Sequence, residues 1–430
     1  MSFSFDLFHG AAAYKPVDWR LKITPILNVN TLNVNELAVV NPNVLKRTQR
    51  DRDYLALEEY FAESKLVDLS AYYDFMSARV GSQPFNADFR GFLFNDINRA
   101  VRIFGTRNDN RDQFNLAYFR QAEKDTNSGL NTFRDRGTNL IFANYYRQDF
   151  IWPGYTAQVS TNYYHDSADL LFDRNSFLIR PDPVGVFTPH NIDAVYFGWA
   201  GDGHIERFNI SHQMYYVMGY DAYNPLAGQA QDIRAAMAAC ELSYDRDYAR
   251  FRTSFFWSSG DRNITNSHAT GFDTIFENSN FAGGPFSYWQ RQSVKLFGVN
   301  LVNNGSLIPD LRSSRIQGQA NYVNPGLLLY NLGFDLDINP KLKMINNCNF
   351  MWLESSAVIE QYVYAGGINN FLGTDLSSGF EYRPFLNNNA IMTVGVSTLV
   401  PGSAFKALYN NPFGTVDPLV AGFAQLTLAY

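Results

Sequence analysis

Side chains that could do catalytic or metal chemistry are few and widely spaced in this chain. None of its six histidines (His9, His165, His190, His204, His212 and His268) has the i, i+4 partner of an HExxH zinc site. His165, Asp166 and Ser167 stand together, but they match a hydrolase site only weakly. The run RNDNRD at 107–112 resembles a calcium loop but lacks its Gly and its distant Glu. We therefore expect no enzyme activity and no cofactor, metal or c-type haem.

The composition instead indicates a protein that crosses a membrane with strands. Aromatic residues make up 16% of the 430 residues, while charged residues make up 18%, below the roughly 25% of soluble proteins. No apolar run approaches the length of a spanning helix, and the mean hydropathy is −0.24. The net charge of −6 excludes a generally basic nucleic-acid binder. Short apolar segments with many aromatics are typical of an outer-membrane β-barrel.

Turn signals divide the chain into hairpins. We predict tight turns at Pro153-Gly154, Asp202-Gly203, Asp245-Arg246, Asn339-Pro340 and Asn387 to Asn389. The segments between these hairpins are longer and rich in Gly, Pro, Asn, Asp and Ser; they are 166–190, 220–231, 260–325, 355–370 and 401–417. Short periplasmic turns that alternate with long outer loops characterise bacterial outer-membrane barrels.

The pattern predicts an all-β fold, a transmembrane antiparallel barrel of about sixteen strands. Their spans are 18–30, 53–64, 70–82, 98–106, 113–122, 138–150, 155–165, 191–201, 204–219, 232–244, 248–259, 326–338, 341–354, 371–384, 390–400 and 418–430. A further hairpin around RQSVKLFGVNLV would make eighteen. We expect residues 1–17 to be a periplasmic or lumenal segment and 18–430 to be one barrel. We also expect the last strand to pair with 18–30, so that both sheet edges disappear.

Parity along the strands separates an apolar face from a charged one. Because Lys or Arg at the bilayer midplane costs roughly 2–4 kcal/mol, the charged face should line the lumen. The predicted pore-lining residues are Arg207, Glu241, Arg250, Arg252, Asp335, Asp337, Lys343, Asp375, Glu381 and Arg383. They form either a charge-lined constriction or a ladder of ion pairs that fixes strand register. The adjacent Glu58 and Glu59 leave the facing of their strand ambiguous.

Two loops carry many apolar and aromatic residues, which argues against disorder. The segment 260–325 exceeds the usual loop length, and we expect it to fold into the lumen or to pack as a cap on neighbouring loops. Folded inward, it would supply Arg291, Lys295, Asp310, Arg312 and Arg315 to a constriction. The loop at 82–96 has Phe85, Phe89, Phe92 and Phe94 as candidate anchors to the barrel top.

The two ends of the sequence and the cysteines complete the prediction. MSFSFDLFHG lacks the basic start and the long apolar core of a signal peptide, so we expect a signal to have been removed. Cys240 and Cys348 fall in different predicted strands, and we expect two free thiols. Tyr430 is a terminal aromatic of the kind found at the membrane interface.

Several stretches resemble a known family. YYDFMSARVGSQPFNADFRGFLFNDINRAVRIFG (72–105) resembles the strand–loop–strand signature of alginate-export outer-membrane barrels. SLIPDLRSSRIQGQANYVNPGLLLYNLGFDLDINPKLK and FEYRPFLNNN are similar to segments of uncharacterised relatives in that group. The resemblance implies a single barrel of sixteen to eighteen strands that passes a polar or anionic solute. Acidic residues of the predicted lining dilute its basic charge, and this departs from the basic lumen of alginate exporters.

These observations predict a passive outer-membrane porin of a Gram-negative type of cell. Its expected partners are outer-membrane lipid, lipopolysaccharide and a small polar solute or saccharide, with no nucleic acid. The alternative is a structural barrel or sheath around a partner subunit, such as a cytochrome or a secretion or motility component, docked in the lumen or beneath it. A homo-oligomer also remains open. An enzyme at the barrel rim, using His165, is the weakest of the three hypotheses.

Overall fold

The computed structural model describes residues 1–430 except 11–15, 34–48, 182–184, 293, 297–298, 414–415 and 430. The described strands form one eighteen-stranded sheet and two small two-stranded sheets. Sixteen long strands follow one another around the large sheet, each antiparallel to its neighbours. They are β2 (Trp19–Asn33), β3 (Gln49–Asp68), β4 (Phe75–Asn86), β5 (Asn95–Arg107), β6 (Asp112–Lys124), β7 (Asn131–Arg147), β8 (Tyr155–Asp166), β11 (Ile192–Ile205), β12 (Phe208–Asn224), β13 (Gln229–Arg246), β14 (Ala249–Ser258), β18 (Leu327–Asn339), β19 (Leu342–Leu353), β20 (Phe371–Tyr382), β21 (Ala390–Pro401) and β22 (Leu419–Leu428). Each predicted strand corresponds to one of these, so the prediction of an antiparallel β-barrel fold is confirmed.

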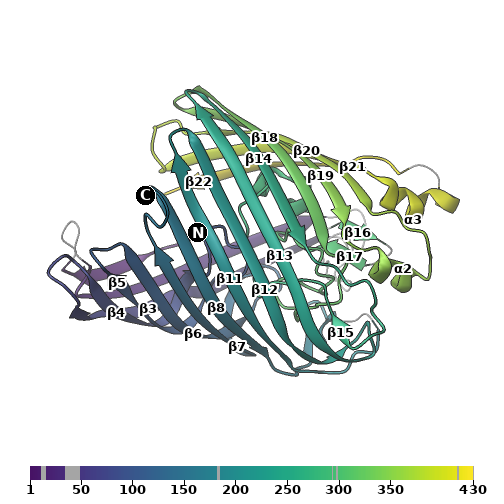
Figure 1. Ribbon diagram of the computed structural model, residues 1–430, viewed down its shortest axis with the longest axis horizontal. Helices are drawn as coiled ribbons and strands as arrows, with labels where there is room; N and C mark the ends of the chain where they lie inside the picture. Colours follow the sequence, from purple (N-terminus) through teal and green to yellow (C-terminus); the bar gives the residue numbers. More distant parts are fainter. Residues whose placement is uncertain are drawn as a thin grey trace.

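The sheet curls around a central space, with β3–β7 on one side, β18–β21 on the other and β11–β14 between them (Figure 1). The edge of β2 opposite β3 is occupied by β1 (Phe5–His9), which pairs in register from Phe5↔Ile23 to His9↔Trp19. The predicted pairing of the last strand with 18–30 is therefore wrong, because β1 already uses those backbone groups. Within the described residues, β22 pairs with β21 and β1 pairs with β2, but β1 and β22 are not paired with each other.

The predicted Asp202-Gly203 turn is wrong. Asp202 pairs with Ser211 inside the ladder, and the turn follows at Glu206-Arg207, where Glu206 has φ 53°. A Cβ on Gly203 would lie 2.5 Å from the carbonyl oxygen of Gly154, so this glycine permits close approach of strands. The next predicted turn is shifted by two residues, because β13 continues to Arg246 and Asp247 takes φ 51°.

Turn lengths differ between the two ends of the strands. At one end, here called the short-turn end, the connections are 69–74, 108–111, 148–154, 206–207, 247–248, 340–341 and 383–389. At the other, the long-loop end, they include 87–94, 125–130, 167–191, 259–326, 354–370 and 402–418. The connection 225–228 is an exception, with four residues at the long-loop end. Trp19 and Leu428 both lie at the short-turn end.

Smaller elements lie in the long loops. The small strands β9 (Leu171–Phe172) and β10 (Leu178–Arg180) pair after β8. The 259–326 loop contains β15 (His268–Ala269), the 3-10 turn η2 (Gly284–Phe286), α1 (Tyr288–Arg291), β16 (Val294–Leu296) and β17 (Val299–Val302). Helices α2 (Ala357–Val363) and α3 (Ser403–Phe413) occupy the last two long loops. Among the described residues, no helix combines the length and the apolar character needed to cross a membrane.

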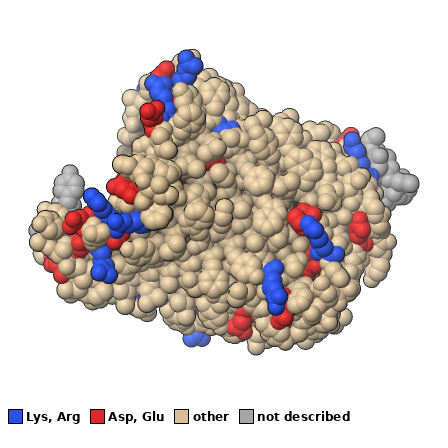
Figure 2. Space-filling model, viewed as in Figure 1, with Lys and Arg blue, Asp and Glu red and all other residues tan. Residues whose placement is uncertain are grey.

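Side chains alternate between an exposed outer face and an inner face. On β12, Met214, Tyr216, Met218 and Tyr220 are exposed, while Gln213, Tyr215 and Val217 are buried. The predicted facing of β14, β18 and β19 is confirmed in the same way: Phe251, Phe255, Tyr330 and Leu332 are exposed outside, and Asn331, Asn347 and Asn349 are buried inside. Charged side chains on the outer surface gather near the strand ends and leave a broad uncharged area between them (Figure 2). Cys240 and Cys348 are both free, as expected.

Candidate functional site: a lumen narrowed by two inserted segments

The hairpin of β4 and β5 leaves the wall and bends inward. Pairing of β3 with β4 ends at Tyr60↔Ser82, and pairing of β5 with β6 ends at Arg99↔Arg120. Beyond these points β4 and β5 pair only with each other, down to Asn86↔Asn95. We call residues 83–98 the inserted tip. Within the inserted tip, β4 and β5 have lost their pairing with β3 and β6. The tip can therefore enter the lumen while β4 and β5 stay paired with each other.

An internal carboxylate shapes the loop of the inserted tip. Asp88 accepts hydrogen bonds from the backbone N–H groups of residues 90 to 93, at 2.6 to 3.1 Å. It also accepts one from Tyr215 Oη on β12, at 3.0 Å. Four backbone donors on one buried carboxylate hold a turn that has no ladder of its own.

The inserted tip reaches the opposite wall. Arg90 donates to Glu241 Oε1 on β13 at 2.9 Å. Phe92 stacks with Phe256 of β14, their ring centroids 6.0 Å apart. Of the four expected anchors, Phe85, Phe92 and Phe94 are buried and Phe89 is half-buried, but they lie inside the lumen and not at its top. The sequence showed the aromatic residues but not the detachment of β4 and β5 that brings them inward.

A buried charge cluster fills the gap that the inserted tip leaves in the wall. Lys124 at the end of β6 contacts Asp96 Oδ1 at 2.7 Å and Glu58 Oε1 at 3.9 Å. Glu58 also accepts from the backbone N–H and the side chain of Asn131 on β7, at 2.9 and 3.0 Å. The register shifts between Thr24 and Pro25, so Glu58 is the extra residue of a β-bulge. The bulge turns both Glu58 and Glu59 inward, which resolves the ambiguous facing of this strand.

The second inserted segment is the long loop, residues 259–326, and a charge cluster lies at its centre. Arg312 Nε donates to Asp273 Oδ2 at 2.8 Å, and Arg315 contacts Asp310 Oδ2 at 2.9 Å. All four side chains are almost fully buried. Burial raises the pKa of Asp310 to about 6, and the neighbouring Asp273 carboxylate adds to this effect. Burial likewise raises the pKa of Glu277, which the nearby Arg315 partly opposes.

The long loop is bonded to the inner wall, and it also contacts the neighbouring loop 167–191, where Gln319 Nε2 donates to His190 O at 2.9 Å. Tyr322 Oη and Tyr196 Oη of β11 share a hydrogen bond, and Arg136 Nη2 of β7 donates to Gly318 O at 2.6 Å. Asp375 of β20 accepts the Ser287 hydroxyl and the backbone N–H of Trp289, the latter at 3.1 Å. Trp289 is 0% exposed. The structure therefore agrees with the inward alternative for this segment.

The additional hairpin expected around RQSVKLFGVNLV exists, but it does not lengthen the wall. Strands β16 and β17 pair only with each other, as a separate sheet. Val294, Leu296, Leu301 and Val302 are buried in the apolar core of the lumen. The eighteen strands of the large sheet come instead from β1 and from β15, which is parallel to β13.

The predicted charged residues separate into distinct groups. Arg252 donates to Asp335 at 2.8 Å, and Lys343 contacts the same carboxylate at 3.4 Å, so three strands share one inward ion cluster. Arg383 pairs with Glu381 at 2.7 Å, at the point where β20 ends. Arg250 pairs with Asp245, an acid that the sequence prediction omitted. Arg207 lies in a turn, 3.6 Å from Asp247.

Other predicted lining residues hold the inserted segments. Glu241 binds the inserted tip through Arg90, and Asp375 binds the start of α1. Asp310, Arg312 and Arg315 are enclosed in the long loop's own core. The Arg291 guanidinium lies 3.4 Å from the Phe423 ring centroid on β22. Lys295 belongs to β16, but its side chain lies outside the described part of the chain.

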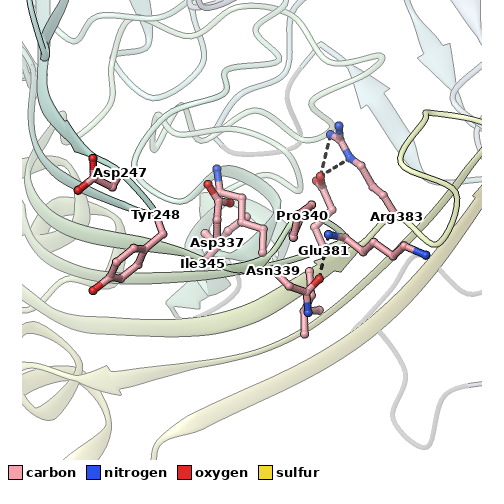
Figure 3. Close-up of a pocket in the computed structure, with 11 residues that line it drawn as sticks. Asp247, Tyr248, Asp337, Asn339, Pro340, Ile345, Glu381 and Arg383 are labelled. Carbon is pink, nitrogen blue, oxygen red and sulfur yellow. Dashed lines mark hydrogen bonds and ion pairs between the residues drawn. The ribbon is translucent and has the colours of Figure 1, made fainter.

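A pocket of about 710 Å³ opens at the short-turn end. Its walls include Asp247, Asp337, Lys341, Lys343, Glu381 and Arg383, three acids and three bases. Figure 3 shows Asp337 near the turn between β18 and β19. It also shows Glu381 and Arg383 near the turn between β20 and β21, bonded to each other. The charged side chains that line this pocket balance in sign.

One part of the inner wall is not covered by the inserted segments. Inward side chains of β2 and β3, such as Arg20, Lys22, Asn28 and Arg52, are only partly buried. Lys22 pairs with Glu59, and Arg79 pairs with Glu63 at 2.6 Å. On β22, Gln425 is exposed. We call this inner surface of β2, β3 and β22 the uncovered wall. Within the described residues, no group of His, Cys, Asp and Glu is arranged to hold a metal ion.

No protein-family model matches this chain, and no curated protein matches it. Among solved structures it is similar to OccK9 (OpdG) of Pseudomonas aeruginosa, with 9% identity, coverage of 99% of this chain and 96% of that chain, and a TM-score of 0.47. The outer membrane protein opdK of the same organism gives 10% identity, 99% and 93% coverage and 0.47. OccK5 (OpdH) gives 12%, 95% and 87%, and 0.46. At these values the likeness carries no argument about function, and none of these comparisons supports the resemblance to alginate-export barrels.

Proposed function

We propose that this chain is an outer-membrane porin with a narrow, charge-lined path for small polar solutes, anions among them. The observation that carries the proposal is the contrast between the two faces of the strands. The outer face exposes aromatic and aliphatic side chains along β11–β14, as a surface in contact with lipid requires. The inner face carries Asn, Ser and paired charges, which suit a polar interior.

The path that we propose follows the uncovered wall. The long loop and the inserted tip bury the inner face from β7 to β20, where Tyr196, Phe256 and Asn349 are each 0% exposed. Along β2 and β3, by contrast, Arg20, Lys22 and Arg52 keep part of their surface accessible. A solute that moves along this wall meets both signs of charge, with Arg50 and Arg52 adding positive charge toward the long-loop end.

The short-turn end faces the periplasm in this proposal, since short periplasmic turns are the rule for outer-membrane barrels. A barrel that serves as a sheath for another protein is a weaker alternative. A partner in the lumen would have to displace the long loop, which hydrogen bonds from Tyr322 to Tyr196 of β11 and from Trp289 to Asp375 of β20 tie to the wall. A solute needs only the width of a narrow path.

Conductance of single molecules in a planar bilayer tests the proposal. We expect small unitary steps, well below those of a sixteen-stranded barrel without an inserted loop. The purified chain should also let small polar molecules into liposomes and exclude larger ones. A correctly inserted barrel that neither conducts ions nor admits any small solute contradicts the porin proposal.

A further inference from the structure

A hydrogen-bonded chain of serine, histidine and aspartate lies on the outer face of the barrel. Ser167 Oγ is 3.2 Å from His165 Nε2, and His165 Nδ1 is 2.8 Å from Asp193 Oδ1. Ser167 directly follows β8, His165 lies on β8 and Asp193 lies on the adjacent β11, directly opposite His165. The three groups belong to neither inserted segment and have no part in the proposed solute path.

The acid of this chain is Asp193, and not the Asp166 that stands between the other two in sequence. Asp166 faces inward, where it accepts from Thr138 Oγ1 at 2.9 Å and from Tyr164 Oη at 2.8 Å. Asp193 also accepts from Tyr163 Oη at 2.6 Å, which fixes its position. Because side chains alternate along β8, His165 and Asp166 had to point to opposite faces.

The order of the contacts suits nucleophilic catalysis. A neutral imidazole that donates Nδ1–H to Asp193 has its lone pair on Nε2, next to the serine hydroxyl. That arrangement lets the histidine accept the serine proton while the aspartate holds the ring. Ser167 Oγ also donates to Gly137 O at 2.9 Å, so rotation of the hydroxyl hydrogen alone selects between the two acceptors.

A groove beside Asp193 offers a place for an apolar chain. It has a volume of about 620 Å³ and is lined by Tyr163, Asp193, Val195, Tyr216, Met218 and Arg234. Tyr216 and Met218 are 43% and 45% exposed on the outer surface. A groove with aromatic and aliphatic walls, and with charged groups at the strand ends, fits an amphiphile with a polar head and an acyl chain.

We propose that Ser167, His165 and Asp193 form a second site, which hydrolyses long-chain acyl esters held at the outer surface of the barrel. This placement of the substrate in lipid rests on the proposed membrane function. A row of polar groups at a membrane boundary would contain the same residue types. It would not by itself align a serine, a histidine and an aspartate in one continuous chain of hydrogen bonds.

The reaction needs only the ester and water. Ser167 Oγ adds to the acyl carbonyl carbon as its proton passes to His165 Nε2, and the ester C–O bond then breaks as the alcohol leaves with that proton. Water attacks the acyl-serine, returns the hydroxyl to Ser167 and releases the carboxylic acid. Asn139 lies opposite His165 on β7, and its Oδ1 is already bonded to Tyr118 Oη at 2.7 Å. Its amide N–H groups are the proposed donors to the developing oxyanion. Asp193 and Tyr163 are positioning residues.

The test uses the full chain in detergent micelles and in liposomes. A biotinylated fluorophosphonate with an alkyl chain is the probe, and peptide mass spectrometry locates the adduct. We expect labelling at Ser167, its loss in Ser167→Ala, and a fall of about 10³-fold or more in His165→Ala. Thr161→Ala and His268→Ala are matched controls: Thr161 is exposed on the outer face of the same strand, and His268 lies at the same end of the barrel, 3.8 Å from Asp232. Both should label like the parent chain.

Asp193→Asn separates catalysis from a structural role. Loss of the correct histidine tautomer should lower the labelling rate by about 10²-fold or more and change its dependence on pH, while heat-modifiable migration of the folded barrel stays the same. Hydrolysis is then followed with p-nitrophenyl palmitate, with phospholipid liposomes and with lipid A, which distinguishes the two membrane sources of an acyl ester. Absence of any Ser167 adduct in the folded parent chain overturns the proposal. Conductance of Ser167→Ala should equal that of the parent, so failure of this site and failure of the porin proposal are separate results.

Discussion

The inner surface of this barrel has a covered half and an uncovered part. From β7 to β20, the long loop and the inserted tip pack against inward side chains, and Tyr196, Phe256 and Asn349 are fully enclosed. Along β2, β3 and β22, inward groups such as Arg20, Lys22 and Gln425 retain contact with solvent. The same alternation of strand residues produces both surfaces. What differs is whether a segment from elsewhere in the chain lies over them.

The comparison shows that polar inward residues make two kinds of contact: some bind inserted segments of the chain, and others pair with each other on the wall. On the covered half they bind the chain itself: Asp375 holds the start of α1, and Glu241 holds Arg90 of the inserted tip. On the uncovered wall, pairs such as Lys22–Glu59 and Arg79–Glu63 satisfy charges that still face the lumen. An inward charge on a barrel strand is therefore evidence of a polar interior, but not of a solute path.

Deleting most of the long loop should have the largest effect on conductance. Gly271 N–H donates to Tyr322 O at 2.8 Å, so residues 271 and 323 can be joined by a short Gly-Ser linker without strain. We expect single-molecule conductance of this deletion to rise several-fold, because the inner face of β11–β20 becomes accessible. Replacement of residues 355–368, which contain α2 at the long-loop end (Figure 1), should change conductance much less. Equal conductance of parent and deletion would mean that the long loop does not limit the path.

Arg312→Ala should destabilise the packing of the long loop while leaving the loop in the chain. Removal of one partner of a buried ion pair costs about 3–5 kcal/mol, and of its ion pairs the Asp273 carboxylate would keep only the longer contact with Arg315, at 3.8 Å. We expect limited proteolysis to cut the long loop much faster while the barrel wall stays intact. Arg262→Ala is the matched control, since the Arg262 side chain is 76% exposed where it pairs with Glu354 and an exposed pair contributes little. Equal cleavage of the two variants would contradict the role given to the buried cluster.

Charge changes on the uncovered wall should alter selectivity. Arg52→Gln removes one inward positive charge from β3, and we expect the reversal potential in a salt gradient to move toward cations. The change in permeability ratio should be less than about two-fold, because physiological salt screens a charge over about 8 Å. Asp53→Asn changes the next residue, which is exposed on the outer face, and should leave the ratio unchanged. A larger effect of the outer substitution would place the path elsewhere.

A weak dependence of the stability of the long loop on pH is the smallest effect that we expect. Burial raises the pKa of Asp310 from 3.8 to about 6. Since the folded pKa lies above the unfolded one, the contribution to stability is fully present below about pH 4 and is lost as pH rises through 6. Openings of the long loop, followed as protease sensitivity or as current fluctuations, should therefore be rarer at pH 5 than at pH 8. Asp310→Asn should flatten this dependence, and an opposite trend in the parent chain would contradict the assignment.

The sequence by itself determined the strands, their facing and the alternation of turn lengths. Apolar and polar residues alternate with period two in β12, β14, β18 and β19, and that periodicity is a local property of the chain. It also indicated that the 260–325 segment is ordered, because a loop rich in Trp, Phe, Tyr and Leu has apolar surface to bury. It did not locate the Glu206-Arg207 turn, since an Asp-Gly pair serves equally well in a turn and where two strands approach closely.

Only the tertiary structure decided which residues meet. The detachment of β4 and β5 depends on where pairing with β3 and β6 stops, and the bulge at Glu58 depends on a register that no single strand contains. For the same reason, the sequence placed Asp166 beside His165, whereas pairing of β8 with β11 brings Asp193 to it. Contacts between strands are set by register across the sheet, and register is a property of the folded sheet and not of a segment.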